Sequence, residues 1–137
     1  MTKVLVSDPI DPAGIDILSQ VAHVDVRTGL SEEELLGAMA DTDALMVRSG
    51  TRVTAAVIDA APHLKIIGRA GVGVDNVDVT AATRRGVLVV NSPEGNTIAA
   101  AEHALAMMLA LTRNIPQPTD RTMHVRWDRK RNNDHEL

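Results

Sequence analysis

Two short runs of the chain combine residues that bind anions. The first, Arg48 to Thr51, sets a guanidinium beside two hydroxyls, and the second, Gly68 to Gly73, places Arg69 just ahead of a Gly-x-Gly pair. Glycine lets the backbone approach a ligand closely and turn successive N–H groups toward a carboxylate or phosphate. Arginine adds a planar, permanently charged fork for the same groups. Together these runs predict a site for a small anion.

Each of the two runs follows a short apolar segment, and such segments recur regularly along the chain. Clusters of Val, Leu, Ile and Met begin at Val4, Val24, Leu45, Ile66 and Val87, so their starts lie 20, 21, 21 and 21 residues apart. This is the spacing of a strand followed by a helix, and the chain lacks the fixed leucine pattern of a solenoid. Five strands alternating with helices predict a doubly wound parallel α/β sheet.

Helix signals fill the intervals between the apolar clusters. The expected N-caps are Asp11 (ahead of Pro12), Ser31, Thr54 and Asp78. Ser31 with Glu34 has the spacing of a capping box, and Gly86 is placed to end the helix that Asp78 opens.

The second cluster differs from the others because Asp25 and Arg27 alternate with valines, whereas the first, third and fifth are apolar throughout. Alternation predicts a strand at an exposed edge, which suits the flavodoxin-like order 2-1-3-4-5. Such sheets bind ligands at the carboxyl ends of their strands. We therefore expect Asp8, the two anion-binding runs and Asn91 along one edge.

The chain divides by pattern into three parts. Residues 1–96 hold the sheet, and residues 97–113 form a long helix that is apolar nearly all round, apart from Glu102, His103 and its ends. A helix of this kind is usually buried from more than one side, so we expect an arm for a second domain or subunit. Residues 114–137 contain two prolines and mixed charges without a period, which is typical of a linker or tail.

Composition excludes several classes of protein. The 137 residues contain no cysteine, which rules out a disulfide scaffold and a Cys-ligated zinc, and the five histidines have no metal-binding spacing. A net charge of -4 with a single aromatic residue argues against nucleic-acid binding. The longest apolar run, Ala104 to Leu111, is too short to cross a bilayer. We therefore expect a cytoplasmic protein with no metal, nucleic-acid or membrane partner.

Simpler interpretations of the same residues remain open at this point. The loop Gly71-x-Gly73-x-x-Asn76 lacks the third glycine of a dinucleotide-binding pattern and could be only a tight turn. An arginine at a strand end is commonly a solvated or salt-bridged surface group, and Asp8 could be structural.

Four longer motifs favour a functional interpretation. They are residues 47–51, residues 68–78, residues 91–97 with 101–103, and residues 110–117. With these motifs the chain resembles, over nearly its whole length, the amino-terminal half of the D-isomer-specific 2-hydroxyacid dehydrogenases. The resemblance implies a substrate-binding domain that closes over a separate NAD-binding domain. It favours the family member that oxidises 3-phosphoglycerate to 3-phosphohydroxypyruvate, the entry step to L-serine.

The same resemblance implies roles at the carboxylate end of the substrate. The backbone of Gly71, Val72 and Gly73 would hold the substrate carboxylate, and Val72 would also lie near the nicotinamide of NAD. Asn96 would hydrogen-bond the substrate.

At the phosphate end, the resemblance implies that Arg48 and Ser49 face the phosphate and that Arg69 adds positive charge. Arg129 matches a position that reaches the phosphate, in cis or from a neighbouring subunit. Val125, and residues 132–135, depart from the family pattern around it.

The family's dinucleotide loop, catalytic arginine, acid and general-acid histidine would all follow residue 137, so no catalytic residue is assigned. One hypothesis is therefore the substrate-binding half of an NAD-dependent dehydrogenase, inactive alone, whose partner is the missing NAD-binding domain. The alternative is a stand-alone anion-binding or interaction module that self-associates through helix 97–113. A receiver-type signalling domain would need Asp in place of Arg48 and Lys in place of Asn91.

Overall fold

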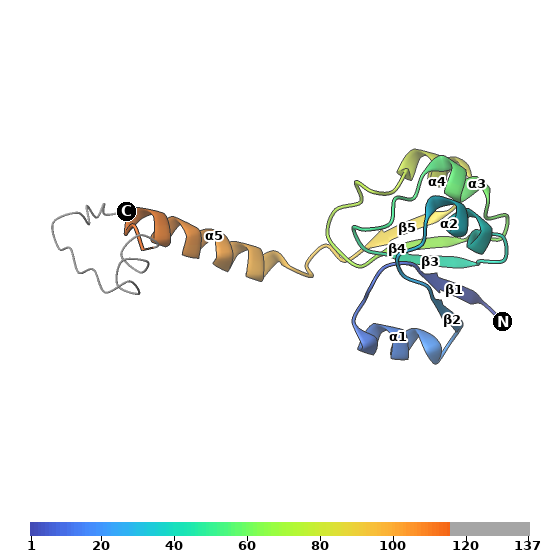
Figure 1. Cartoon of the computed structure of the whole chain (residues 1–137), viewed down its shortest axis with the longest axis horizontal. Coiled ribbons are helices and arrows are strands. Elements are labelled where there is room, and N and C mark those ends of the chain that lie inside the picture. Colours follow the sequence, from blue (N-terminus) through green and yellow to red (C-terminus); the bar gives the residue numbers. More distant parts are fainter. Residues whose placement is uncertain (116–137) are drawn as a thin grey trace. The chain divides into compact units, whose positions relative to one another are not determined.

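The computed structural model describes residues 1–115 and divides the chain into two units, Met1–Gly95 and Asn96–Leu137 (Figure 1). The strands of the first unit are β1 (Lys3–Val6), β2 (His23–Val26), β3 (Ala44–Val47), β4 (Ile66–Arg69) and β5 (Leu88–Asn91). Its helices are α1 (Pro12–Ser19), α2 (Glu32–Met39), α3 (Ala55–Asp59) and α4 (Val79–Arg84). The described part of the second unit contains α5 (Thr97–Thr112).

The five strands form one parallel sheet in the order β2-β1-β3-β4-β5, which confirms the prediction. The strand order reverses at β1, which has β2 on one side and β3 on the other. Because all strands run in one direction, the loops after β1, β3, β4 and β5 emerge at the same edge.

The helices begin where the caps predict. The Asp11 carboxylate accepts a hydrogen bond from Ala13 N, and Ser31 and Glu34 form a complete capping box. Thr54 and Asp78 accept from the backbone N–H groups of Val57 and Ala81. Gly86 follows α4 with φ 69°, a conformation that glycine adopts without a steric penalty.

The main core lies between the sheet and helices α2, α3 and α4, which cover one face, while α1 lies on the other (Figure 1). Leu5, Leu45 and Ile67 are fully buried on the first face. Val4 and Val6 turn to the second face, where they form a smaller cluster with Ala22. The alternation of β1 between two buried faces explains why this strand is apolar throughout.

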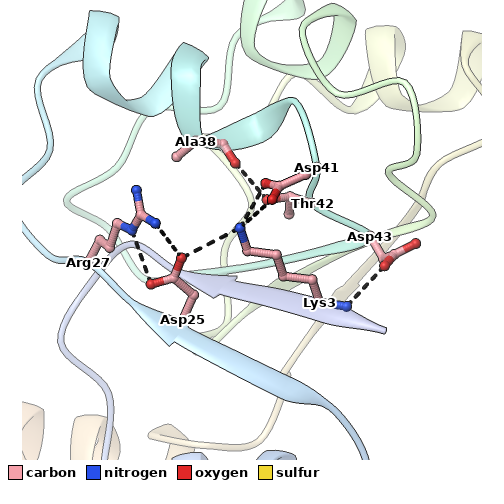
Figure 2. A network of polar contacts seen from close by, with 7 residues as sticks. All are labelled: Lys3, Asp25, Arg27, Ala38, Asp41, Thr42 and Asp43. Atoms are coloured by element: carbon pink, nitrogen blue, oxygen red, sulfur yellow. Dashed lines mark hydrogen bonds and ion pairs between the residues drawn. The ribbon is translucent and has the colours of Figure 1, made fainter. Parts of the chain in front are cut away.

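A network of ion pairs lies at the β2 edge of the sheet. Figure 2 shows the Lys3 ammonium between Asp25 and Asp41, at 3.6 and 2.7 Å. The hydrogen bond from Arg27, together with the charges of Arg27 and Lys3, holds the pKa of Asp25 below its ordinary value. The backbone N–H of Lys3 donates to Asp43 at 2.9 Å, so the network also joins β1 to the start of β3.

The opposite edge strand, β5, differs from what its apolar sequence suggests. Val89 packs against the main core, but Leu88 and Val90 are 57% and 39% exposed. These two side chains share the α1 face of the sheet, because alternate residues point to opposite faces. Within the described residues of the first unit, α1 contacts β2 and leaves β5 uncovered on that face.

Helix α5 has 16 residues, close to its predicted range, and none of them is buried. Its apolar side chains Ile98, Leu105, Met107, Met108 and Leu111 are all more than half exposed. Asn114 follows with φ 50°, the left-handed conformation that ends many helices. In the described part of the chain, no helix is long and apolar enough to span a membrane.

Candidate functional site

Asp8 holds the loop after β3 in place. Its carboxylate accepts hydrogen bonds from Arg48 N at 2.7 Å, from Thr51 N at 3.0 Å and from Thr51 Oγ1 at 2.9 Å. Burial alone would raise the pKa of Asp8, but these hydrogen bonds outweigh it and lower the pKa below its ordinary value. A Cβ at Gly50 would lie 2.7 Å from Asp8 Oδ1, so a larger residue there would displace the Asp8 carboxylate. The geometry supports the structural interpretation of Asp8.

Asn76 joins the loop after β3 to the loop after β4. Its Nδ2 donates to the carbonyl oxygens of Arg48 and Thr51, both at 2.7 Å, and its Oδ1 accepts from Arg69 Nε at 2.9 Å. A short parallel bridge between Val53 and Val77 runs beside it. One side chain thus contacts both anion-binding runs.

Arg69 lies across the glycine-rich loop. Its side chain is only 12% exposed, and its Nη2 lies 3.8 Å from a carboxylate oxygen of the exposed Asp75. A Cβ at Gly71 would meet Arg69 Nη1 at 2.6 Å, and one at Gly73 would meet Asp75 Oδ1 at 2.8 Å. Both glycines therefore make room for neighbouring side chains, a reason that their spacing alone did not reveal.

The loop presents two backbone N–H groups on one side. The Gly71 carbonyl accepts from Ser92 N at 3.0 Å, and the Val72 carbonyl accepts from Asn91 Nδ2 at 2.6 Å. In a trans peptide the N–H points away from the carbonyl, so the N–H groups of Val72 and Gly73 point away from β5. Within residues 1–115 neither group has an acceptor. Two successive unpaired N–H groups can bind a carboxylate.

The remaining predicted residues are placed as follows. Arg48 and Ser49 are exposed at the carboxyl end of β3, and Arg48 Nη1 donates a long hydrogen bond to the Pro9 carbonyl at 3.4 Å. Asn96 is the N-cap of α5 and belongs to the second unit, and its side chain makes no capping hydrogen bond. Arg129 lies outside the described residues. The structure thus links Arg48, Arg69 and residues 71–73 within one unit.

A cavity of about 710 Å³ adjoins this cluster at the same edge of the sheet. Its walls come from the loops after β1, β2 and β3, including Asp8, Thr28, Thr51 and Arg52. None of the six predicted substrate-binding residues in the first unit lines it. The cavity is therefore a neighbour of the predicted site.

The glycine-rich loop does not fit a dinucleotide. The third glycine position holds Asn76, whose side chain is engaged by Arg48, Thr51 and Arg69. The following helix, α4, has six residues, and the Asp78 carboxylate occupies its N-terminus, where a pyrophosphate would meet negative charge. In residues 1–115, no three His, Cys, Asp or Glu side chains cluster as metal ligands do.

Asn76 and Asn91 are the site residues that sequence reasoning missed. The sequence analysis considered Asn76 only as the residue in place of a third glycine. It considered Asn91 as a polar residue at a strand end and as a departure from the receiver-type pattern. A signal existed in each case, since a side-chain amide can donate to backbone carbonyls. The carbonyls themselves come from segments 19 to 28 residues away.

The sequence matches the family model of the D-isomer specific 2-hydroxyacid dehydrogenase catalytic domain over residues 4–124. It is 65% identical over 130 residues to a D-3-phosphoglycerate dehydrogenase of Synechocystis sp., a match that covers 95% of this chain and 24% of the relative. The chain spans about a quarter of the length of the curated relatives it matches.

Solved structures show the same fold. The TT0316 protein from Thermus thermophilus superposes with a TM-score of 0.86 at 30% identity, covering 99% of this chain and 46% of that one. An NAD+-bound 3-phosphoglycerate dehydrogenase of Entamoeba histolytica superposes with a TM-score of 0.72 at 28% identity, covering 82% of this chain and 39% of that one.

Proposed function

Because the chain belongs to the D-isomer specific 2-hydroxyacid dehydrogenase family, we propose that it is the substrate-binding part of an NAD-dependent D-3-phosphoglycerate dehydrogenase. The whole enzyme would oxidise 3-phosphoglycerate to 3-phosphohydroxypyruvate in L-serine biosynthesis. The observation that carries the proposal is the pair of unpaired N–H groups at Val72 and Gly73, beside the array that Asn76 builds from Arg69 and the Arg48 loop.

The substrate carboxylate binds to the N–H groups of Val72 and Gly73. The carbonyls of the same two peptide groups are tied back to Ser92 and Asn91, so the N–H groups are oriented before the ligand arrives. Preorganised donors lose little entropy on binding, which favours them over flexible side chains. Val72, which is 41% exposed, also lies near the nicotinamide in this proposal.

The phosphate binds on the side of Arg48, Ser49 and Arg69. Arg69 is nearly buried and held by Asn76, so its guanidinium supplies a fixed positive charge. Arg48 is exposed and can reorient from its 3.4 Å contact with Pro9. Asn96 and Arg129 complete the substrate contacts in this proposal, as the family resemblance suggests.

The chain alone does not transfer hydride in this proposal. General acid–base chemistry needs a titrating group within reach of the substrate. Of the histidines in the first unit, His23 starts β2 and His63 lies just ahead of Lys65 and β4, so both are at the amino ends of strands, the edge opposite the site. NAD binding is the task of a further domain, which α5 would contact through its exposed apolar side chains.

The second candidate function is a stand-alone anion-binding or interaction module. The exposed apolar surface of α5 favours it, because such a surface can pair two copies of the chain. Both candidates bind an anion at the same loop. They are distinguished by ligand preference, because only the dehydrogenase part is expected to prefer a phosphorylated hydroxy acid.

Ligand-observed NMR on the 137-residue chain tests that preference. We expect 3-phosphoglycerate to bind with a dissociation constant on the order of millimolar, more tightly than glycerate and less tightly as salt rises. Glycerate shares the carboxylate and hydroxyl, and inorganic phosphate shares only the phosphate, so the two serve as matched controls. Equal affinity for 3-phosphoglycerate and glycerate would contradict the proposed substrate.

A further inference from the structure

Asn76 is the one side chain in the described part of the chain that bonds to both anion-binding runs. It holds the Arg48 and Thr51 carbonyls on one side and Arg69 Nε on the other, all within 2.9 Å. The two donors of its amide and one acceptor position of its oxygen are thereby used inside the protein.

The orientation of the Asn76 amide follows from its partners. A carbonyl oxygen can only accept a hydrogen bond and Arg69 Nε–H can only donate one. The NH2 group must therefore face the two carbonyls and the oxygen must face Arg69. In the reversed orientation the amide oxygen would face two carbonyl oxygens and the NH2 group would face the Arg69 N–H, so no hydrogen bond could form at any of the three contacts.

The backbone holds the two loops together independently of this side chain. Val53 N donates to the Asn76 carbonyl at 2.8 Å, and Asp78 N donates to the Val53 carbonyl at 2.9 Å. Val53 and Val77 are 1% and 7% exposed and belong to the main core. Removing the Asn76 amide therefore leaves the loop pairing and the core in place.

We propose that Asn76 is the positioning residue that sets the preference for phosphorylated over unphosphorylated hydroxy acids. It fixes the direction of the Arg69 guanidinium relative to the backbone of the Arg48 loop, so that a phosphate contacted by Arg48 meets a second cationic group that is held in place. This inference rests on the proposed function. Its consequence can be tested, because the Asn76 amide bonds to Arg69 and to the carbonyls of the Arg48 loop and makes no hydrogen bond to the N–H groups of Val72 and Gly73.

Asn91 provides the matched contrast. Its Nδ2 donates to the Val72 carbonyl at 2.6 Å, so it orients the carboxylate-binding N–H of Gly73, and its side-chain amide makes no hydrogen bond to either arginine. Loss of the Asn91 amide should weaken 3-phosphoglycerate and glycerate alike. Loss of the Asn76 amide should weaken the binding of 3-phosphoglycerate more than the binding of glycerate.

The experiment is an amide NMR titration of the chain with both acids, for the unmodified protein and for Asn76→Ala, Asn76→Asp, Asn91→Ala and Thr83→Ala. Thr83 lies exposed on α4 and its hydroxyl bonds only within that helix, so Thr83→Ala is a neutral control. We expect Asn76→Ala to lower the preference for 3-phosphoglycerate about tenfold, the size of one charge-assisted hydrogen bond. Asn76→Asp should lower it further, because its carboxylate repels the Arg48 and Thr51 carbonyls and neutralises Arg69.

The outcomes distinguish a failure of this inference from a failure of the proposed function. An unmodified chain that shows no preference for 3-phosphoglycerate overturns both. A clear preference that Asn76→Ala leaves within about twofold overturns the role of Asn76 and leaves the function standing. If Asn91→Ala changes the preference as much as Asn76→Ala does, both act by general loosening and the specific role is wrong.

Discussion

Replacing Asp8 by alanine should destabilise the first unit by about 3 kcal/mol. The substitution removes three hydrogen bonds to a charged acceptor, from Arg48 N, Thr51 N and Thr51 Oγ1. Hydrogen bonds to charged groups each contribute about 1.5 to 3 kcal/mol. Even the lower sum of these values is not reached, because Asp8 and Thr51 line the adjoining cavity and water can reach the freed donors.

Asp8→Asn should cost only about 1 kcal/mol. The amide oxygen can accept from both backbone N–H groups, and the amide nitrogen can donate to the Thr51 hydroxyl, so mainly the charge is lost. For a unit of this size each kcal/mol lowers the melting temperature by roughly 4 to 8 °C. We therefore expect the melting temperature, followed by circular dichroism, to fall by roughly 12 to 24 °C for Asp8→Ala and far less for Asp8→Asn.

The effect has a defined pH dependence. The folded-state pKa of Asp8 is lowered, so its contribution is complete above the unfolded pKa of about 4 and is lost as pH falls through the folded pKa. The difference in melting temperature between the unmodified protein and Asp8→Asn should become smaller below about pH 4. Asp59→Ala is the control. It breaks an ion pair with Arg85, but the Asp59 side chain is 65% exposed, so the pair contributes little to stability. A melting temperature for Asp8→Ala equal to that of Asp59→Ala would refute the reasoning.

Three further predictions follow from the site and from α5. The purified chain should not oxidise 3-phosphoglycerate with NAD. An oxidation activity that copurifies with the chain, followed by the absorbance of reduced nicotinamide, would contradict this. The chain should self-associate at tens of micromolar through the exposed apolar face of α5, and Met107→Glu should lower the mass seen by light scattering; a monomer unaffected by Met107→Glu would count against it. Arg48→Lys should weaken 3-phosphoglycerate binding about tenfold in an NMR titration while glycerate is unaffected, because a point charge replaces a bidentate fork; equal affinity would place the phosphate elsewhere.

Local sequence signals predicted most of the fold correctly. The 20- and 21-residue spacing of the apolar clusters reflects one strand and one helix per unit, and Asp11, Ser31, Thr54 and Asp78 cap their helices through contacts within three residues. Alternation at Asp25 identified the β2 edge because a charge there must reach solvent or a partner. The exposure of Leu88 was not predictable, since it depends on which elements cover the second face of the sheet.

The sequence singles out the candidate site residues but not the geometry around them. The arginines and glycines stand out by type, but the sequence does not show that Gly71 is small to admit Arg69. The roles of Asn76 and Asn91 depend on which carbonyls the fold brings within hydrogen-bond distance of each amide. Such contacts arise from the pairing of loops after different strands, which no local pattern encodes.

The most direct test of the proposed site is the amide spectrum of the chain titrated with glycerate and then with 3-phosphoglycerate. We expect both acids to shift the amide signals of Val72 and Gly73, and only 3-phosphoglycerate to shift signals at Arg48, Ser49 and the Arg69 side chain. Shifts that leave residues 71–73 unchanged and gather instead at Thr28 and Arg52, in the adjoining cavity, would contradict it.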